Sequence, residues 1–230
     1  EECFSEKKIN CVIFSGSIFI PIANRNLSGA INIINSNVSL SDVSIINSKA
    51  EDAINLVSSS FEIDKLSVDG SFSDAVDLDF SSGVIKKLFC MNIGNDCLDI
   101  SEANVTVQNI EVFNAEDKAI SAGENTNLFI DKIDIFDSAI GLVSKDGSKL
   151  EVKNANFNDV VLPIAVFQKK ASYKDPFIRI DSAESDDEIF GFFNDEINAQ
   201  VPSSVTKKFL SSDEIEALLY GSTYGKATVK

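Results

Sequence analysis

One pattern of residues recurs six times between Asn37 and Phe167, and it constrains the fold more than any other feature of this chain. Each unit has apolar residues at alternating positions, then a turn residue, then a second short apolar segment. A fixed period of this length predicts a solenoid in which each unit stacks on its neighbours. The turn residues, which are 22 or 23 positions apart, are Asn47, Gly70, Asn92, Asn114, Asp137 and Asp159.

The aligned units place apolar residues in six columns. Alternation within a unit predicts β-strands, because successive strand side chains point to opposite sides. No unit buries its apolar side alone, so stacked units share one core. We predict an all-β protein, a right-handed parallel β-helix of about seven coils of about 22 residues. The columns are Val38, Phe61, Gly83, Val105, Leu128, Leu150; Leu40, Ile63, Ile85, Val107, Ile130, Val152; Val43, Leu66, Leu88, Ile110, Ile133, Ala155; Ile45, Val68, Cys90, Val112, Ile135, Phe157; Ile54, Val76, Leu98, Ile120, Ile140, Ile164; and Leu56, Leu78, Ile100, Ala122, Leu142, Val166.

The ends of a solenoid must differ from its repeats. We expect an N-terminal cap and first irregular coil over 1–29, the parallel β-helix over 30–182, and a coil remnant, loop and helix over 183–230. Ser211 and Glu214 form a capping box, which predicts the start of a short C-terminal helix. We expect this helix to cap an open end of the solenoid.

Composition excludes several classes of function. The chain has no histidine, which excludes Ser-His and Cys-His nucleophiles and imidazole metal ligands. Its formal charge of −16 provides no basic surface for nucleic acid or an anionic membrane. No apolar run is long enough for a transmembrane segment. The chain opens at Glu1 without an initiator methionine, so we expect a mature product or a piece of a longer protein.

The repeats resemble those of a known family. The unit from Asn104 to Ile120 and the segment Gly94-Asn95-Asp96-Cys97-Leu98-Asp99-Ile100-Ser101 look like coils of pectin-lyase-like right-handed β-helix proteins. They look most like the β-helix modules of bacterial surface proteins, including those beside CotH-type kinase domains. The resemblance implies the fold over roughly residues 30–180 and an extracellular or cell-surface location in a bacterium. It does not select an activity, because that superfamily holds lyases, hydrolases, epimerases, adhesins and inert spacers.

One enzyme motif is similar but incomplete. Polygalacturonases carry Asn-Thr-Asp-Gly-Ile-Asp and, one coil later, Gly-Asp-Asp-Cys, where this chain has Phe72-Ser73-Asp74-Ala75-Val76-Asp77 and Gly94-Asn95-Asp96-Cys97. Phe72 replaces the asparagine, and Asn95 replaces one carboxylate of the acid pair. The family's Gly-His-Gly and Arg-Ile-Lys are absent. Because inverting hydrolysis needs both carboxylates, we expect no polygalacturonase activity.

Aspartates gather on two adjacent coils. Asp74, Asp77 and Asp79 belong to one coil, and Asp96 and Asp99 belong to the next. Asp77 and Asp99 alternate with core residues, so we expect both to point outward, about 4.8 Å apart along the rod. Asp79 lies two residues along the same side. We call these aspartates the acidic face.

Like charges on neighbouring strands destabilise a sheet, and three interpretations of the acidic face remain open. In the first, Asp52, Asp74 and Asp96 hold a turn column through hydrogen bonds to the backbone, and the others are solvated. In the second, the acidic face binds a divalent cation, and calcium fits because it takes several carboxylate oxygens. The resemblance to pectate lyases also implies calcium. The third is catalysis by these acids.

The sequence as a whole favours a non-catalytic structural or binding module whose partner is a polysaccharide or a surface protein, with calcium as the one cofactor considered. The alternative is a polysaccharide-active enzyme, a calcium-dependent lyase before a hydrolase, that uses Asp77, Asp79 and Asp99. Lys118 is the only candidate for the base that such a lyase needs.

The four cysteines allow two disulfides, Cys90–Cys97 and Cys3–Cys11, and the sequence does not decide whether either one forms. Cys90 and Cys97 occupy positions of small or aliphatic core residues, which suits buried thiols better than a disulfide. Cys3 and Cys11 lie in the N-terminal segment, where a bridge and two free thiols are about equally compatible with the sequence.

Overall fold

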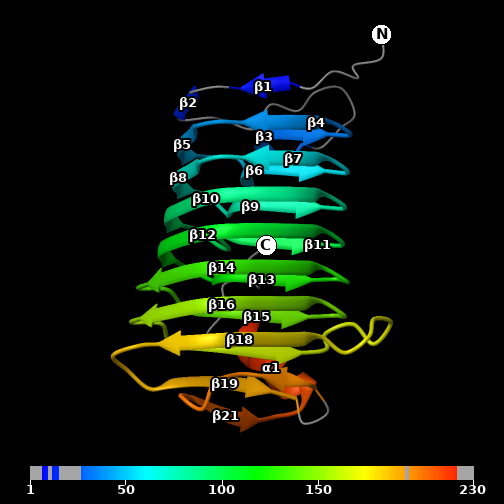
Figure 1. Ribbon diagram of the computed structural model, residues 1–230, viewed down its shortest axis with the longest axis vertical. Coiled ribbons are helices and arrows are strands. Elements are labelled where there is room, and N and C mark those ends of the chain that lie inside the picture. Colours follow the sequence, from blue (N-terminus) through cyan, green and yellow to red (C-terminus); the bar gives the residue numbers. More distant parts are fainter. Residues whose placement is uncertain (1–6, 10–11, 16–26, 195–196, 222–230) are drawn as a thin grey trace.

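The strands stack into a parallel β-solenoid of about eight turns, spaced about 22 residues apart (Figure 1). The computed structural model describes residues 7–9, 12–15, 27–194 and 197–221. The predicted all-β parallel solenoid is confirmed, with about one turn more than expected. Cys3 and Cys11 lie outside the described residues.

Two parallel sheets run along the solenoid, and we call them sheet 1 and sheet 2. The twelve strands of sheet 1 are β1 (Lys7–Ile9), β2 (Val12–Ser15), β4 (Asn37–Leu40), β5 (Val43–Ser48), β7 (Ser60–Ile63), β8 (Leu66–Ser71), β10 (Ser82–Ile93), β12 (Asn104–Ala115), β14 (Asn127–Phe136), β16 (Lys149–Asn158), β18 (Phe177–Glu184) and β20 (Ala199–Gln200). The nine strands of sheet 2 are β3 (Gly29–Ile34), β6 (Asp52–Val57), β9 (Asp74–Asp79), β11 (Leu98–Ser101), β13 (Lys118–Gly123), β15 (Ile140–Lys145), β17 (Leu162–Phe167), β19 (Ile189–Phe193) and β21 (Val205–Phe209).

The predicted columns of sheet 1 are confirmed in register. Leu88, for example, pairs with Leu66 on one side and Ile110 on the other, and all three are buried. The predicted turn residues all have positive φ angles, which lie between 49° at Asp137 and 81° at Gly70. Glycine, asparagine and aspartate tolerate this left-handed conformation best, which explains why the turns carry these residues.

One unit of sheet 2 is displaced by two residues from the predicted alignment. Leu142 pairs with Ile120, and Ser144 pairs with Ala122, so Ile140 lies outside the predicted column. A shift of two residues leaves the same side chains on the inner side of a strand. Alternation of apolar and polar residues therefore cannot detect such a displacement.

The C-terminal helix is confirmed, but it packs on the side of the solenoid. Helix α1 (Ser212–Leu219) begins with the predicted capping box. Ile215 and Leu219 form one buried apolar cluster with Val143 and Ala165, which lie on the outer side of sheet 2. The outer side of β15, β17 and β19 is apolar, and the helix packs there against β17 and β19 and not over the open end (Figure 1). Among the described residues, no helix has the length and apolar character needed to cross a membrane.

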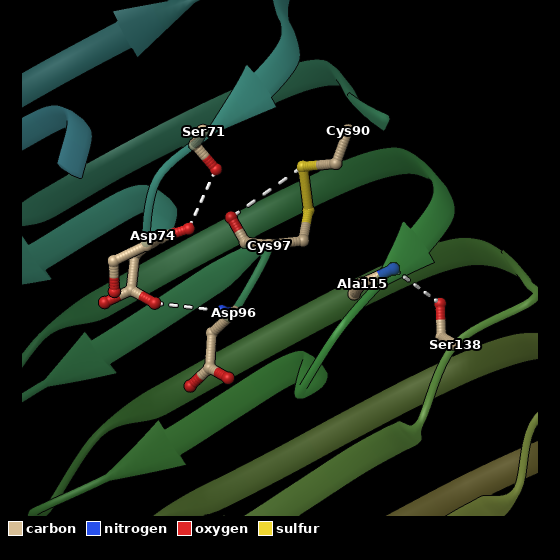
Figure 2. The surroundings of a disulfide bond; sticks show 8 residues. Ser71, Asp74, Cys90, Asp96, Cys97, Ala115 and Ser138 are labelled. Carbon is tan, nitrogen blue, oxygen red and sulfur yellow. Dashed lines mark hydrogen bonds between the residues drawn. A yellow bond between two sulfur atoms is a disulfide. The ribbon is translucent and has the colours of Figure 1, made fainter. Parts of the chain in front are cut away.

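Cys90 and Cys97 form a disulfide, so the interpretation that favoured two buried thiols is wrong (Figure 2). The bridge joins β10 to the turn before β11, and both cysteines are fully buried. It therefore links the two sheets within one coil, directly behind the turn that carries Asp96.

Candidate functional site

The acidic face lies on the outer side of sheet 2, as predicted. β9 and β11 pair in register, which places Asp77 opposite Asp99. The same column continues to Asn55 on one side and to Ser121 on the other. Asp79 lies two residues farther along β9, on the same side of the strand. The alternation of core and outer residues thus predicted the position of these three carboxylates correctly.

Asp74 and Asp96 hold the turns that precede the strands. Oδ1 of Asp74 accepts a hydrogen bond from the backbone N–H of Asp96 at 2.9 Å (Figure 2). The same oxygen also accepts from Nδ2 of Asn95 at 2.7 Å. Oδ1 of Asp96 accepts from the backbone N–H of Lys118 at 2.9 Å. Each carboxylate therefore joins its coil to the next, which is the arrangement that the turn-column interpretation predicts for these two aspartates.

Lys118 lies inside a buried ion cluster and not on the open acidic face. Its Nζ is 2.5 Å from Oδ2 of Asp117 and 3.4 Å from Oδ1 of Asp96, and its side chain is 3% exposed. Burial alone disfavours the charge, but Asp96 and Asp117 raise the pKa of Lys118 above its usual range. Burial raises the pKa of Asp96, and Lys118 opposes that effect. Lys118, the candidate base predicted from the sequence, is therefore enclosed by protein and protonated.

Lys145 is the cation of this face that sequence reasoning missed. It ends β15, and its side chain reaches back one coil, where Nζ donates to Oγ of Ser121 at 3.0 Å. A Cβ on Gly123 would lie 3.0 Å from Cε of Lys145, so the glycine leaves room for this path. Burial disfavours the charge, but Asp99 raises the pKa of Lys145 above its usual range. The sequence pattern places the Lys145 side chain on the outer side of its strand, but it does not show that this side chain extends to the neighbouring coil.

Burial and mutual repulsion keep protons on the acidic face. Burial raises the pKa of Asp77 to about 9, helped by the charges of Asp52, Asp79 and Asp99. Burial and the charge of Asp99 raise the pKa of Asp74 to about 6, against its hydrogen bonds from backbone and side chain. Burial first and Asp99 second also raise the pKa of Asp79. A protonated carboxyl at Asp77 thus stands opposite Asp99 at neutral pH.

The five carboxylates do not form a preorganised metal site. The described residues contain no group of three or more histidine, cysteine, aspartate or glutamate side chains that could hold a metal ion. Asp74 and Asp96 each use one oxygen for a backbone N–H. Calcium takes six to eight oxygen ligands, some of which can be water, and the carboxylates of the described residues are not gathered into such a group. Calcium binding at the acidic face stays a prediction.

The acidic face can therefore attract cations and hold a proton, but neither nearby lysine is a neutral amine. Lys118 is enclosed by carboxylates, and Lys145 lies at the border of the face. This combination suits electrostatic binding better than proton abstraction. No protein-family model matches this chain, and no curated protein or solved structure matches it either.

Proposed function

We propose that this chain is a non-catalytic structural and binding module, and that the acidic face is its binding surface. The observation that carries this proposal is the state of the two lysines nearest the carboxylates. Lys118 is buried between Asp96 and Asp117, and Lys145 stays protonated beside Asp99. A lyase needs a neutral base to remove a proton from a sugar carbon, and neither lysine supplies one.

A secreted or cell-surface location in a bacterium belongs to the same proposal. The Cys90–Cys97 bridge supports it, because disulfides persist in oxidising compartments and are rare in the cytosol. The 22-residue spacing of the coils supports a relationship with pectin-lyase-like β-helix proteins, among them the modules beside CotH-type kinase domains. The partner classes are a polysaccharide and a surface protein, and calcium is the cofactor to test.

One observation favours the alternative of a calcium-dependent lyase. Nζ of Lys145 reaches Ser121, which lies one coil from Asp99, so a cation does lie near the acids, as a lyase requires. Hydrolysis has no such support, because Asn95 occupies the place of the second carboxylate and donates a hydrogen bond to Asp74.

An activity assay separates the two proposals. The purified chain is incubated with polygalacturonate and other acidic polysaccharides, with and without calcium, and unsaturated ends and reducing ends are followed. We expect neither product. Unsaturated ends that disappear in Lys145→Ala but persist in Lys169→Ala, a lysine beside Tyr220, would overturn the proposal in favour of a lyase. Reducing ends that disappear in Asp96→Asn would overturn it in favour of a hydrolase.

A further inference from the structure

Two exposed phenylalanines stand at the ends of β9, the central strand of the acidic face. Phe72 precedes the strand and is 71% exposed, and Phe80 follows it and is 58% exposed. Phe72 and Phe80 are separated by the length of the six-residue strand, so they are two single apolar contacts at its ends and not one apolar patch. Of the four large hydrophobic residues that the described chain exposes, two bracket this one strand. The other two are Val161 and Phe209.

Neither the core nor the backbone explains Phe80. Its φ is 51°, and the corresponding corners of neighbouring coils hold Asn35, Ser58 and Glu102, which also have positive φ. The left-handed region costs a residue with a side chain about 1–2 kcal/mol, and a bulky aromatic there is unusual. A polar residue fits this corner in the other coils, so an exposed phenylalanine here has no benefit for the fold.

The outer side of sheet 2 already serves as a docking surface within this chain. Helix α1 covers the outer side of β15 and β17, where Ile215 and Leu219 bury Val143 and Ala165. The main neighbours of β9 in the described residues are the strands of its own coil and of the adjacent coils. Among the described residues, no element covers the half of sheet 2 that carries Phe72 and Phe80 in the way that helix α1 covers the other half.

The charged residues on this half of sheet 2 restrict which partners can bind there. Asp74, Asp77 and Asp79 project between the two phenylalanines, and Asp99 lies opposite Asp77. An apolar partner alone would cover Asp79 and Asp99 without supplying an opposite charge, and a small cation alone would leave the phenylalanines exposed. A segment with lysine or arginine between apolar ends satisfies both, and phenylalanine rings also attract such cations.

We propose that the outer face of β9 and β11 docks an extended basic segment of a partner protein. One apolar side chain packs on Phe72 and another on Phe80, and lysine or arginine side chains lie opposite Asp79 and Asp99. This inference rests on the proposed function, because it assigns a protein partner to the binding surface proposed above.

The test uses a synthetic peptide with leucine at both ends and lysine at alternating positions between them. We expect it to bind the full chain at low ionic strength, measured by calorimetry or fluorescence anisotropy. Phe72→Ser and Phe80→Asn should each weaken binding about tenfold, because the partner's apolar end then loses its contact. Phe209→Ser, the matched change on β21, should leave binding unchanged. Phe80→Asn should melt no lower than the wild type, which separates lost binding from lost folding.

Several results would overturn this inference. They are no measurable binding of the lysine peptide, equal loss of binding in Phe209→Ser and Phe80→Asn, and equal binding of a peptide with glutamate at the lysine positions. Binding of a cationic polysaccharide such as a chitosan oligomer in place of the peptide assigns a different occupant, as does a dimer that Phe80→Asn dissociates. Cleavage of a polysaccharide defeats the proposed function, whereas absence of peptide binding defeats only this inference.

Discussion

Asp77 shows how burial and repulsion within the acidic face disfavour the charged form of a carboxyl group. Nδ2 of Asn55 donates to its Oδ2 at 2.8 Å, but burial and four neighbouring carboxylates act against its charge. The pKa of Asp77 is therefore about 9 in the folded chain, well above the value of about 3.9 expected in an unfolded one. Between these values the folded chain holds a proton that the unfolded chain has released.

Linkage fixes the sign of the resulting pH dependence. The stability associated with the protonated carboxyl is fully present below about pH 4 and is lost as pH rises toward about 9. Asp77→Asn keeps a neutral group at every pH. We expect this variant to be more stable than the wild type by about 1–3 kcal/mol at pH 8, with little difference near pH 4, in urea unfolding curves.

The matched control is Asp42→Asn, which changes a half-exposed aspartate paired with Lys65 on sheet 1. This control should keep the wild-type pH dependence. A wild-type stability that is flat between about pH 5 and pH 8 would contradict the argument, and so would an Asp77→Asn variant that is less stable at the higher pH.

At the scale of strands and helices, the repeat predicted most of the fold because every coil must bury its apolar side chains in the same way. Columns in sheet 1 could be aligned because each unit ends at a left-handed turn residue, such as Asn92 or Asn114. In sheet 2 the predicted alignment of the unit that contains Ile140 was wrong by two residues, because the alternation of apolar and polar residues is the same after such a shift. The reach of Lys145 and the Cys90–Cys97 bridge depend on how coils stack, which no local pattern encodes.

The columns give a direct test at this scale. Ile110 is 1% exposed and stacks between Leu88 and Ile133 in the middle of the rod. Ile110→Ala should lower the free energy of unfolding by about 2–4 kcal/mol, because the neighbouring coils cannot collapse into the cavity. Asn109→Ala, the change at the adjacent exposed position, should stay within about 0.5 kcal/mol of the wild type. Similar losses in both variants would mean that the column is not core.

The whole molecule is an acidic rod whose sheet 2 changes character along its length. One outer column runs from Asn55 through Asp77 and Asp99 to Ser121. Farther along the rod the outer residues become apolar, beginning at Val143, and helix α1 covers them. Within the described residues, helix α1 thus covers one half of sheet 2, and the other half carries the acidic face.

A calcium ion held by Asp77, Asp79 and Asp99 would balance the charge of the acidic face by drawing the three carboxylates together. Because calcium would then bind only the folded chain, it should stabilise it by about 2.7 kcal/mol at a hundredfold excess over Kd. Sodium chloride of equal ionic strength should reproduce only the part that comes from screening. Asp99→Asn should abolish the calcium-specific increment while raising stability without calcium, because one repulsive charge is removed.

The turn-column interpretation predicts the opposite result in the same melting curves. Calcium then acts no better than matched sodium chloride, since Asp74 and Asp96 already have backbone partners. Asp96→Asn should cost more stability than Asp99→Asn, because it weakens the bond to the backbone of Lys118 and leaves the buried lysine with one carboxylate fewer. A melting temperature indifferent to millimolar calcium would therefore contradict the metal proposal, and the carboxylates of Asp79 and Asp99 would remain for a basic partner to pair with.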